Sequence, residues 1–205
     1  MANELGRVAP PVIPYAQSEY DAVTQVQTNS ILRLFFNRLL SQIDALLSKE
    51  DGGKALYFPR ALVYSTTTQT AAEVDTGYAL ELENTYIDNG VRIENDTQMH
   101  VSADGVYNFQ VTMQFTQTNS SAAQVYTWIS KNGVDVPYGG QVTTLTGSNN
   151  QSIHWNFSID LLADGYITMY WATSDTAVSL TSVAPTAPHP GIPSAVVAVT
   201  YVSNY

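Results

Sequence analysis

The stretch from Gly105 to Phe115, GVYNFQVTMQF, alternates apolar and polar positions along its length. The odd-numbered side chains from Tyr107 to Phe115 are all large and apolar, whereas most of the even-numbered ones between them are polar. A period of two places the two sets on opposite faces of a β-strand. We therefore expect one face of this strand to be buried and the other to meet solvent or a partner.

The same period recurs through residues 61–205, in SIHWNFSIDLL (152–162), YITMYWA (166–172) and AAQVYTWIS (122–130), with shorter strands in YALEL (78–82) and NGVRIEN (89–95). Turn signals separate the strands: DNG at 88–90, ADG at 103–105, KNG at 131–133, YGG at 138–140, TGSNN at 146–150 and ADG at 163–165. Short strands punctuated in this way predict a sandwich or a barrel. The apolar face of Tyr107 is expected to pack against a second sheet, in one core with the face from Ile153 to Leu161.

The last predicted strand, PSAVVAVTYV (193–202), is apolar on both faces. One face carries Val197, Val199 and Tyr201, and the other carries Val196, Ala198 and Val202. A strand of an antiparallel sheet commonly has one wet face. The second apolar face therefore predicts a subunit interface.

Residues 18–50 are predicted to form a helix. SEYD reads as a capping box in which Ser18 accepts backbone donors, and DGG at 51–53 ends the helix before a linker that runs to residue 60. Steps of four and three residues along one side define a heptad seam of about two heptads, made of Leu32, Phe36, Leu39, Ile43 and Leu46. Further apolar residues widen this face. The helix therefore either joins a three-helix cluster or packs on its own β domain, and we favour self-association because it lies outside the β region.

Residues 1–17 are predicted to form an arm, because Pro10, Pro11 and Pro14 favour an extended conformation. A segment of this kind has no core of its own, so it either frays or docks on a partner surface. We favour docking, through Val8, Pro10, Pro11, Val12, Ile13, Pro14 and Tyr15.

Composition and charge narrow the classes of function. Only 13% of the 205 residues are charged, and the absence of cysteine excludes disulfides, thiol catalysis and thiolate metal sites. Residues 1–60 are neutral, whereas residues 61–205 carry the whole net charge of −10 with only two basic side chains, Arg92 and Lys131. Phosphate binding needs Lys and Arg, so a nucleic-acid partner is not expected. The chain begins with no apolar signal region and has no run of 18 apolar residues, so neither secretion nor a membrane span is expected.

Four segments resemble the jelly rolls of tumour-necrosis-factor-like and complement-globular-head-like proteins: GVYNFQ (105–110), WISKNG (128–133), LLADGYITMYW (161–171) and the closing strand PSAVVAVTYV. Tyr166 stands where that family has Asp in its Leu-x-x-Gly-Asp strand start. The resemblance covers residues 61–203 and implies an all-β, ten-strand jelly-roll sandwich that forms a homotrimer, with its two termini together at the base.

Residues 1–60, with ILRLFFNRLLSQIDALL followed by ALYFPRALVYS, resemble the N-terminal segments of virion structural proteins from tailed bacteriophages. Together the two resemblances imply a homotrimeric capsid decoration, or cement, protein on the outer surface of the virion, bound to the major capsid protein or another virion protein. The alternative is a fibre or adhesin tip that binds a host surface glycan or receptor.

The sequence offers little for catalysis, and we expect no enzyme, cofactor or metal. His100, His154 and His189 lie on separate segments, and Asp104, Asp160 and Asp164 are more simply turn residues than a catalytic carboxylate pair. Aromatic residues with a polar tip favour interfaces. We therefore assign Tyr126, Trp128 and Tyr170 to the trimer contact of the head, with a glycan-binding surface as the alternative.

Overall fold

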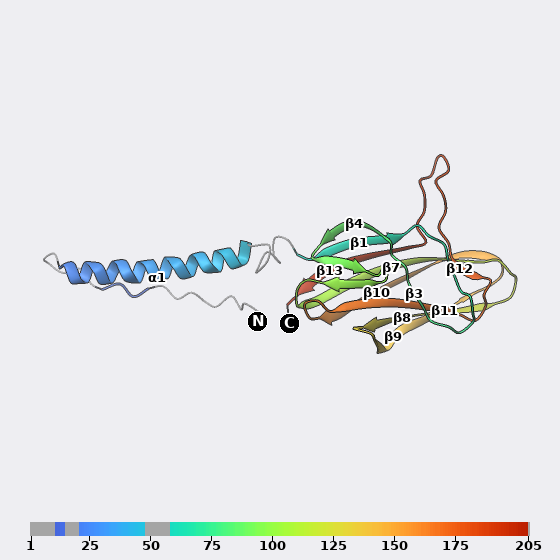
Figure 1. The fold of residues 1–205 in the computed structure, drawn as a ribbon, viewed down its shortest axis with the longest axis horizontal. Coiled ribbons are helices and arrows are strands. Elements are labelled where there is room, and N and C mark those ends of the chain that lie inside the picture. Colours follow the sequence, from blue (N-terminus) through green and yellow to red (C-terminus); the bar gives the residue numbers. More distant parts are fainter. Residues whose placement is uncertain (1–10, 15–20, 48–57, 205) are drawn as a thin grey trace. The chain divides into compact units, whose positions relative to one another are not determined.

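The computed structural model describes residues 11–14, 21–47 and 58–204. The chain divides into two compact units, one of residues 1–58 and one of residues 59–205. Figure 1 shows a helix in the first unit and a β-sandwich in the second. The fold class expected from the sequence, an all-β sandwich of jelly-roll type preceded by a helix, is confirmed.

The helix α1 spans Ala22–Leu47. Asp21 precedes it and caps it: its carboxylate accepts the backbone N–H groups of Val23 and Thr24, at 3.0 and 3.1 Å, and the Thr24 hydroxyl at 2.6 Å. The Thr24 hydroxyl and the two N–H groups together lower the pKa of Asp21. The carboxylate of Asp21 thus satisfies the free donors of the first turn, and the expected cap, Ser18, lies outside the described residues. The predicted stop at 51–53 lies outside the described residues.

Every described side chain of α1, from Ala22 to Asp44, remains at least partly exposed. The exposed apolar ones are Val23, Val26, Leu34, Phe36, Leu40 and Ile43. In the arm, Pro11, Val12, Ile13 and Pro14 are neither helix nor strand, and Val12 and Ile13 are exposed. The other arm residues assigned to docking, Val8, Pro10 and Tyr15, lie outside the described residues.

The first sheet of the sandwich has the strand order β10-β7-β13-β1-β4. These strands span Asn149–Leu161, Gly105–Gln117, Ala195–Ser203, Arg60–Ser65 and Asn84–Asn89. The short strand β12 (Val178–Leu180) pairs with the far end of β7 and is joined by β2 (Gln69–Thr70). All of the described pairings in this sheet are antiparallel.

The second sheet has the order β5-β6-β11-β8-β9. Its strands span Val91–Glu94, Gln98–Val101, Tyr166–Thr173, Ala123–Lys131 and Val134–Leu145. The two-residue strand β3 (Tyr78–Ala79) pairs with β11 beyond β6. Ten of the described strands are four residues or longer, and they divide equally between the two sheets.

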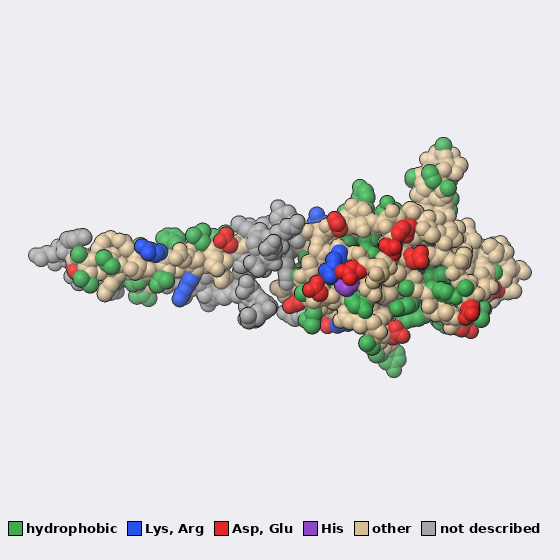
Figure 2. Space-filling view, viewed as in Figure 1, with side chains coloured by type: hydrophobic (Ala, Val, Ile, Leu, Met, Phe, Trp, Pro, Cys, Tyr) green, Lys and Arg blue, Asp and Glu red, His purple; other side chains and the backbone are tan. Residues whose placement is uncertain are grey.

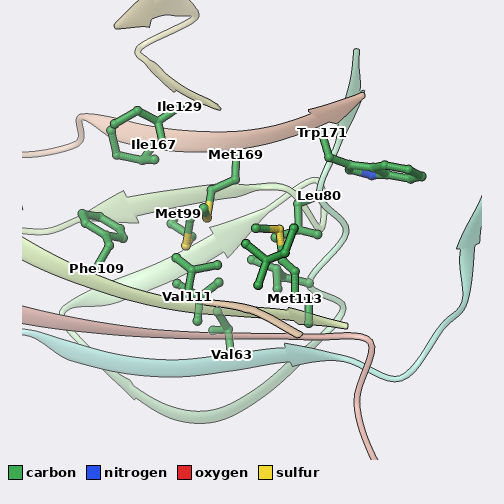
Figure 3. Close-up of a cluster of buried hydrophobic side chains, with 14 of the residues drawn as sticks. Val63, Leu80, Met99, Phe109, Val111, Met113, Ile129, Ile167, Met169 and Trp171 are labelled. Carbon is green, nitrogen blue, oxygen red and sulfur yellow. The ribbon is translucent and has the colours of Figure 1, made fainter. Parts of the chain in front are cut away.

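The core lies between the inner faces of the two sheets. In Figure 3, Val111 and Met113 of β7 face Met99 and Met169 of the second sheet. The odd-numbered residues of β7 are buried from end to end, and the inner face of β10 adds the buried Ile153 and Leu161 and the partly buried Trp155, Phe157 and Ile159. The predicted common core of these two strands is therefore confirmed, although they lie side by side in one sheet and pack together against the other.

Both ends of the head lie at one end of the sandwich. Arg60 at the start of β1 pairs with Thr200 near the end of β13, and the backbone N–H of Tyr201 donates to the carbonyl of Pro59 at 2.9 Å. The opposite end of the same strand pair carries Ser65 and Ala195. The loops near Ser65 are thus separated from the entering chain by the length of β1.

One turn signal was misread from the sequence. YGG at 138–140 lies inside β9, where the pairing with β8 shifts register and Tyr138 adopts a φ of +60° with its side chain fully exposed. Five residue steps on β9, from Asp135 to Gly140, here face two on β8, from Ser130 to Trp128, and glycine neighbours ease the local bend. The strand therefore continues through a motif that usually marks a turn.

Gly105, the first residue of β7, gives a test of the packing between β7 and β13. A Cβ at this position would lie 2.3 Å from Cε2 of Tyr201 and 2.6 Å from the carbonyl oxygen of Ser203. We expect Gly105→Ala to lower the free energy of unfolding by about 1–3 kcal/mol, because the ring and the strand must move. Urea denaturation measures the change. The control is Gly191→Ala, whose nearest neighbour would be 3.4 Å away. Equal stability of the two variants would contradict this packing.

Candidate interaction surfaces

The solvent side of β4, β1 and β13 forms an outer apolar face, made of Leu62, Tyr64, Ile87, Val196 and Ala198. Ala198 pairs with Leu62 and Val196 with Tyr64, and all four are half-buried. The face exists because the residues that alternate with the buried ones of β13, Val196 and Ala198, are apolar as well. Val202 lies beyond it, near a register shift at the end of β13, and is 57% exposed.

The solvent side of β7 and β10 continues the same sheet with neutral polar side chains. His154 lies opposite Thr112, and one of its ring nitrogens is 3.1 Å from the Thr112 hydroxyl. The amide of Asn108 donates to Asn156 at 2.6 Å and to Ser158 at 3.2 Å. The rows that cross the sheet from Leu62 and Tyr64 to β10 therefore carry no Asp, Glu, Lys or Arg side chain.

The predicted contact residues Tyr126, Trp128 and Tyr170 lie on the solvent side of the second sheet, which we call the aromatic face. Trp128 and Tyr170 are paired across β8 and β11 and stack with ring centroids 5.5 Å apart. The indole of Trp128 donates to Asp135 at 3.2 Å, and its ring also packs against Gly77. Tyr126 is 37% exposed. Much of the stacked pair is thus already covered by the chain itself.

The sequence therefore assigned residues of two different surfaces to one head contact. Val196 and Ala198 lie outside the first sheet, whereas Tyr126, Trp128 and Tyr170 lie outside the second. The two sheets pack face to face, so their solvent sides point away from each other. Periodicity within a single strand gives the side of its own sheet, but it does not give the sheet to which the strand belongs.

A further surface feature is the hairpin of residues 181–194, which projects from the sandwich between β12 and β13 (Figure 1). Two backbone pairs hold it: Val183 and Ile192 exchange hydrogen bonds at 2.8 Å, as do Thr186 and His189 at 2.9 and 3.2 Å. Its base is fixed by the buried Ser194, whose hydroxyl donates to the carbonyl of Thr67 at 2.7 Å. The hairpin contains no Asp, Glu, Lys or Arg, and Figure 2 shows it with only apolar and neutral side chains.

Arg92 of the head is paired with two carboxylates. Arg92 contacts Glu94 at 2.8 Å and Asp164 at 3.2 Å, and the hydrogen bond from Arg92 lowers the pKa of Glu94. His100, buried in β6, lies 3.3 Å from Glu94 and stacks on Tyr166. This group joins β5 and β6 to the turn before β11. The pairing of β5 with β6 brings Arg92 and Glu94 to His100, and the pairing of β6 with β11 adds Asp164 and Tyr166.

The three aspartates considered for catalysis occupy separate structural positions. Asp104 accepts the backbone N–H of Ala163 at 2.6 Å, and Asp164 has a φ of +63° in the following turn. Asp160 on β10 pairs with Lys131 at the end of β8, with 2.8 Å between Oδ2 and Nζ. This ion pair links the two sheets at the side where β9 and β10 form their edges.

The described residues contain no group of three or more His, Asp or Glu side chains that could hold a metal ion. Within the described part of the chain, no helix is both long and apolar enough to span a membrane. No protein-family model matches the sequence, and no curated protein matches it. The resemblance to tumour-necrosis-factor-like jelly rolls therefore stays a prediction.

The pair of Lys131 and Asp160 predicts a pH dependence of stability. The hydrogen bond from Lys131 lowers the pKa of Asp160 below its ordinary value. Its contribution to stability is therefore fully present above the unfolded pKa of about 4 and is lost as the pH falls through the folded pKa. We expect Asp160→Asn to be slightly less stable than the wild type at pH 7, because a pair this exposed contributes little, and the difference to shrink as the pH falls below about 4. Urea denaturation at pH 7, 5 and 3 tests this, with Asp88→Asn as the control. A difference that persists unchanged at pH 3 would refute the assignment.

Proposed function

We propose that this chain is a structural virion protein of a tailed bacteriophage: a homotrimeric decoration protein of the capsid. The arm and helix bind the shell, and the jelly-roll head faces solvent on the outer surface of the particle. The observation that carries the proposal is the helix α1, an apolar helix whose described side chains all remain partly exposed. Isolated helices are marginal in water, and most helices in proteins are stabilised by packing an apolar face. In the proposed trimer, the helices of the other two copies cover the apolar side chains of α1.

The heptad seam along α1 favours self-association as the way in which its apolar side chains are buried. Leu32 and Leu39 are half-buried, and Phe36 and Ile43 are exposed by 54% and 38%. Leu46 continues the seam along the helix backbone. The remaining exposed apolar residues, Val23, Val26, Leu34 and Leu40, widen the surface beyond the narrow stripe that a two-stranded coil needs. A three-helix cluster covers more of such a surface.

In the head, we assign the trimer contact to the outer apolar face. If copies contact one another through two surfaces that point in opposite directions, they stack into an open row. A threefold ring instead needs contacts related by a rotation that brings the third copy back to the first. The outer apolar face and the aromatic face therefore do not both serve one threefold contact. The outer apolar face carries no charge, whereas Trp128 and Tyr170 of the aromatic face are already packed within the chain.

The ends of the head and the charge distribution are consistent with an anchored particle subunit. The chain enters the head at Pro59, beside the end of β13, which leaves the loops near Ser65 at the other end of β1. Residues 61–205 carry the net charge of −10, and residues 1–60 are neutral. The neutral part can approach a shell protein without repulsion, and the acidic part favours solubility.

A decoration protein of this kind acts as a clamp. Three arms linked in one trimer bind with an effective concentration that a single arm lacks, so weak individual contacts give strong attachment. Binding to the assembled shell, but not to free coat subunits, shifts the equilibrium away from disassembly.

The projecting hairpin favours a second function, that of a fibre or adhesin tip. Its base is held by hydrogen bonds, and it contains no Asp, Glu, Lys or Arg, which suits insertion into a groove of another protein. Contact with a glycan usually uses aromatic side chains, and residues 181–194 contain no Phe, Tyr or Trp. Copy number separates the two functions, because a decoration protein is present in many copies per particle and a fibre in few. Quantitative mass spectrometry of purified particles measures it.

Substitution on β13 tests the head contact. We expect Ala198→Asp to weaken trimer association at least about tenfold, because it buries a charge in the contact, and to leave the fold intact because Ala198 is half-exposed in one copy. Sedimentation velocity over a dilution series measures association, and circular dichroism checks the fold. The matched control on the aromatic face is Tyr126→Asp. Dissociation by Tyr126→Asp and not by Ala198→Asp would assign the contact to the other sheet.

Deletion of residues 1–20 tests the anchor. The shortened chain keeps α1 and the head, so we expect a soluble trimer that no longer sediments with particles from which the native protein has been stripped. The full-length protein is the control and should rebind. Full-strength binding by the shortened chain would argue against an arm that grips the shell. A monomeric full-length protein would refute the trimer itself.

A further inference from the structure

Four buried polar side-chain atoms have no hydrogen-bond partner in the described parts of the chain: Oε1 of Gln117, Oγ1 of Thr127, Nε2 of Gln141 and Nε1 of Trp171. A buried polar group without a partner destabilises the folded state. Native proteins therefore pair nearly all such groups, and bound water serves where protein atoms do not reach.

Three of these four atoms belong to one row across the second sheet. Thr127 on β8 pairs with Trp171 on β11 on one side and with Gln141 on β9 on the other. Thr127 and Trp171 are 2% and 1% exposed and point into the core, where Figure 3 shows Trp171. Side chains paired across neighbouring strands have Cβ atoms about 4.5–5.5 Å apart. The three side chains are therefore neighbours in one row, with Thr127 in the middle.

The chemistry of the row defines what it can bind. The indole N–H of Trp171 and the amide nitrogen of Gln141 only donate hydrogen bonds, whereas the Thr127 hydroxyl both donates and accepts. A ligand that accepts two hydrogen bonds and donates one satisfies all three atoms. A cation would meet two donor groups, and an anion would be buried with no basic side chain in the row, which is costly.

We propose that Thr127, Gln141 and Trp171 form an internal hydration site that binds one ordered water molecule between the two sheets. The water accepts from Trp171 and Gln141 and donates to Thr127, and three partners are typical of buried water. Gln141 is the outermost member, on the edge strand β9, and is itself partly exposed. Water exchanges with solvent from that edge. The inference does not depend on the proposed function.

The site has a structural consequence for the edge of the second sheet. A water held by three strands cross-links β11, β8 and β9 on their inner face. It fixes the side chains of Gln141 and Trp171 and so opposes a register slip of β9, whose pairing with β8 is already interrupted by the bulge between Gly140 and Asp135.

The test compares Thr127→Val, which keeps the shape and removes the hydroxyl, with Thr143→Val. Thr143 lies on the inner face of β9 opposite Val125, one row away, and has no orphaned atom among the described residues. In the wild type, we expect a cross-relaxation peak in NMR between the indole N–H of Trp171 and a long-lived water. Thr127→Val should abolish this peak and lower the thermal midpoint by about 2–4 °C. Thr143→Val should retain the peak.

The sign of the stability change separates the alternatives. If the hydroxyl were buried without any partner, Thr127→Val would raise the midpoint, because it removes an unsatisfied group. Absence of the water peak in the wild type, or such a rise, overturns the proposal. If Thr127→Val does not fold, Gln141→Met at the partly exposed edge takes its place, and persistence of an unchanged peak in that variant likewise overturns it.

Discussion

The structure depends on β7, which carries the inner wall of one sheet and positions the strands on both of its sides. Its odd-numbered residues, Gly105 to Gln117, are all buried, and its two edges are paired with β10 along one side and with β13 and β12 along the other. A slip of one residue would turn Tyr107, Phe109 and Phe115 toward solvent. Burial of each large apolar side chain contributes about 1.5–3 kcal/mol, so this register is strongly preferred.

The inner faces of both sheets are buried in the core. A partner can therefore contact only the solvent sides of the sheets, the projecting hairpin and α1, among the described parts of the chain. The side chains present there are largely neutral, and two basic side chains of the head, Arg92 and Lys131, are engaged with carboxylates. In the proposed assembly, recognition by this head therefore depends on shape and apolar contact. The acidic side chains act mainly by repulsion between copies outside the contact. Such a surface suits permanent assembly better than electrostatically steered binding.

The sequence predicted the features that one segment encodes alone. The alternation from Gly105 to Phe115, the two apolar sides of β13 and the turn at Asn132 followed from local pattern. Features that depend on two segments were missed or misplaced: the bulge at Tyr138, the stack of Trp128 on Tyr170, and the row through Thr127 all require knowledge of register. The cap of the described helix, Asp21, was not singled out from the sequence, since Ser18 and Asp21 are both good caps and local pattern does not rank them.

Association through the head alone and through the helix alone would each be marginal. Stable contacts bury about 800 Å² on each partner, and the outer apolar face offers five side chains of moderate size, from Leu62 to Ala198. A seam of about two heptads is short for an isolated coiled coil. Both contacts lie on one chain, so formation of either raises the effective concentration of the groups that form the other. The free energies of the two contacts then add, while the entropic cost of bringing the copies together is incurred only once. The proposed trimer thus requires the short segment between Leu47 and Phe58 to keep helix and head in one molecule, and cleavage there would separate two weak associations.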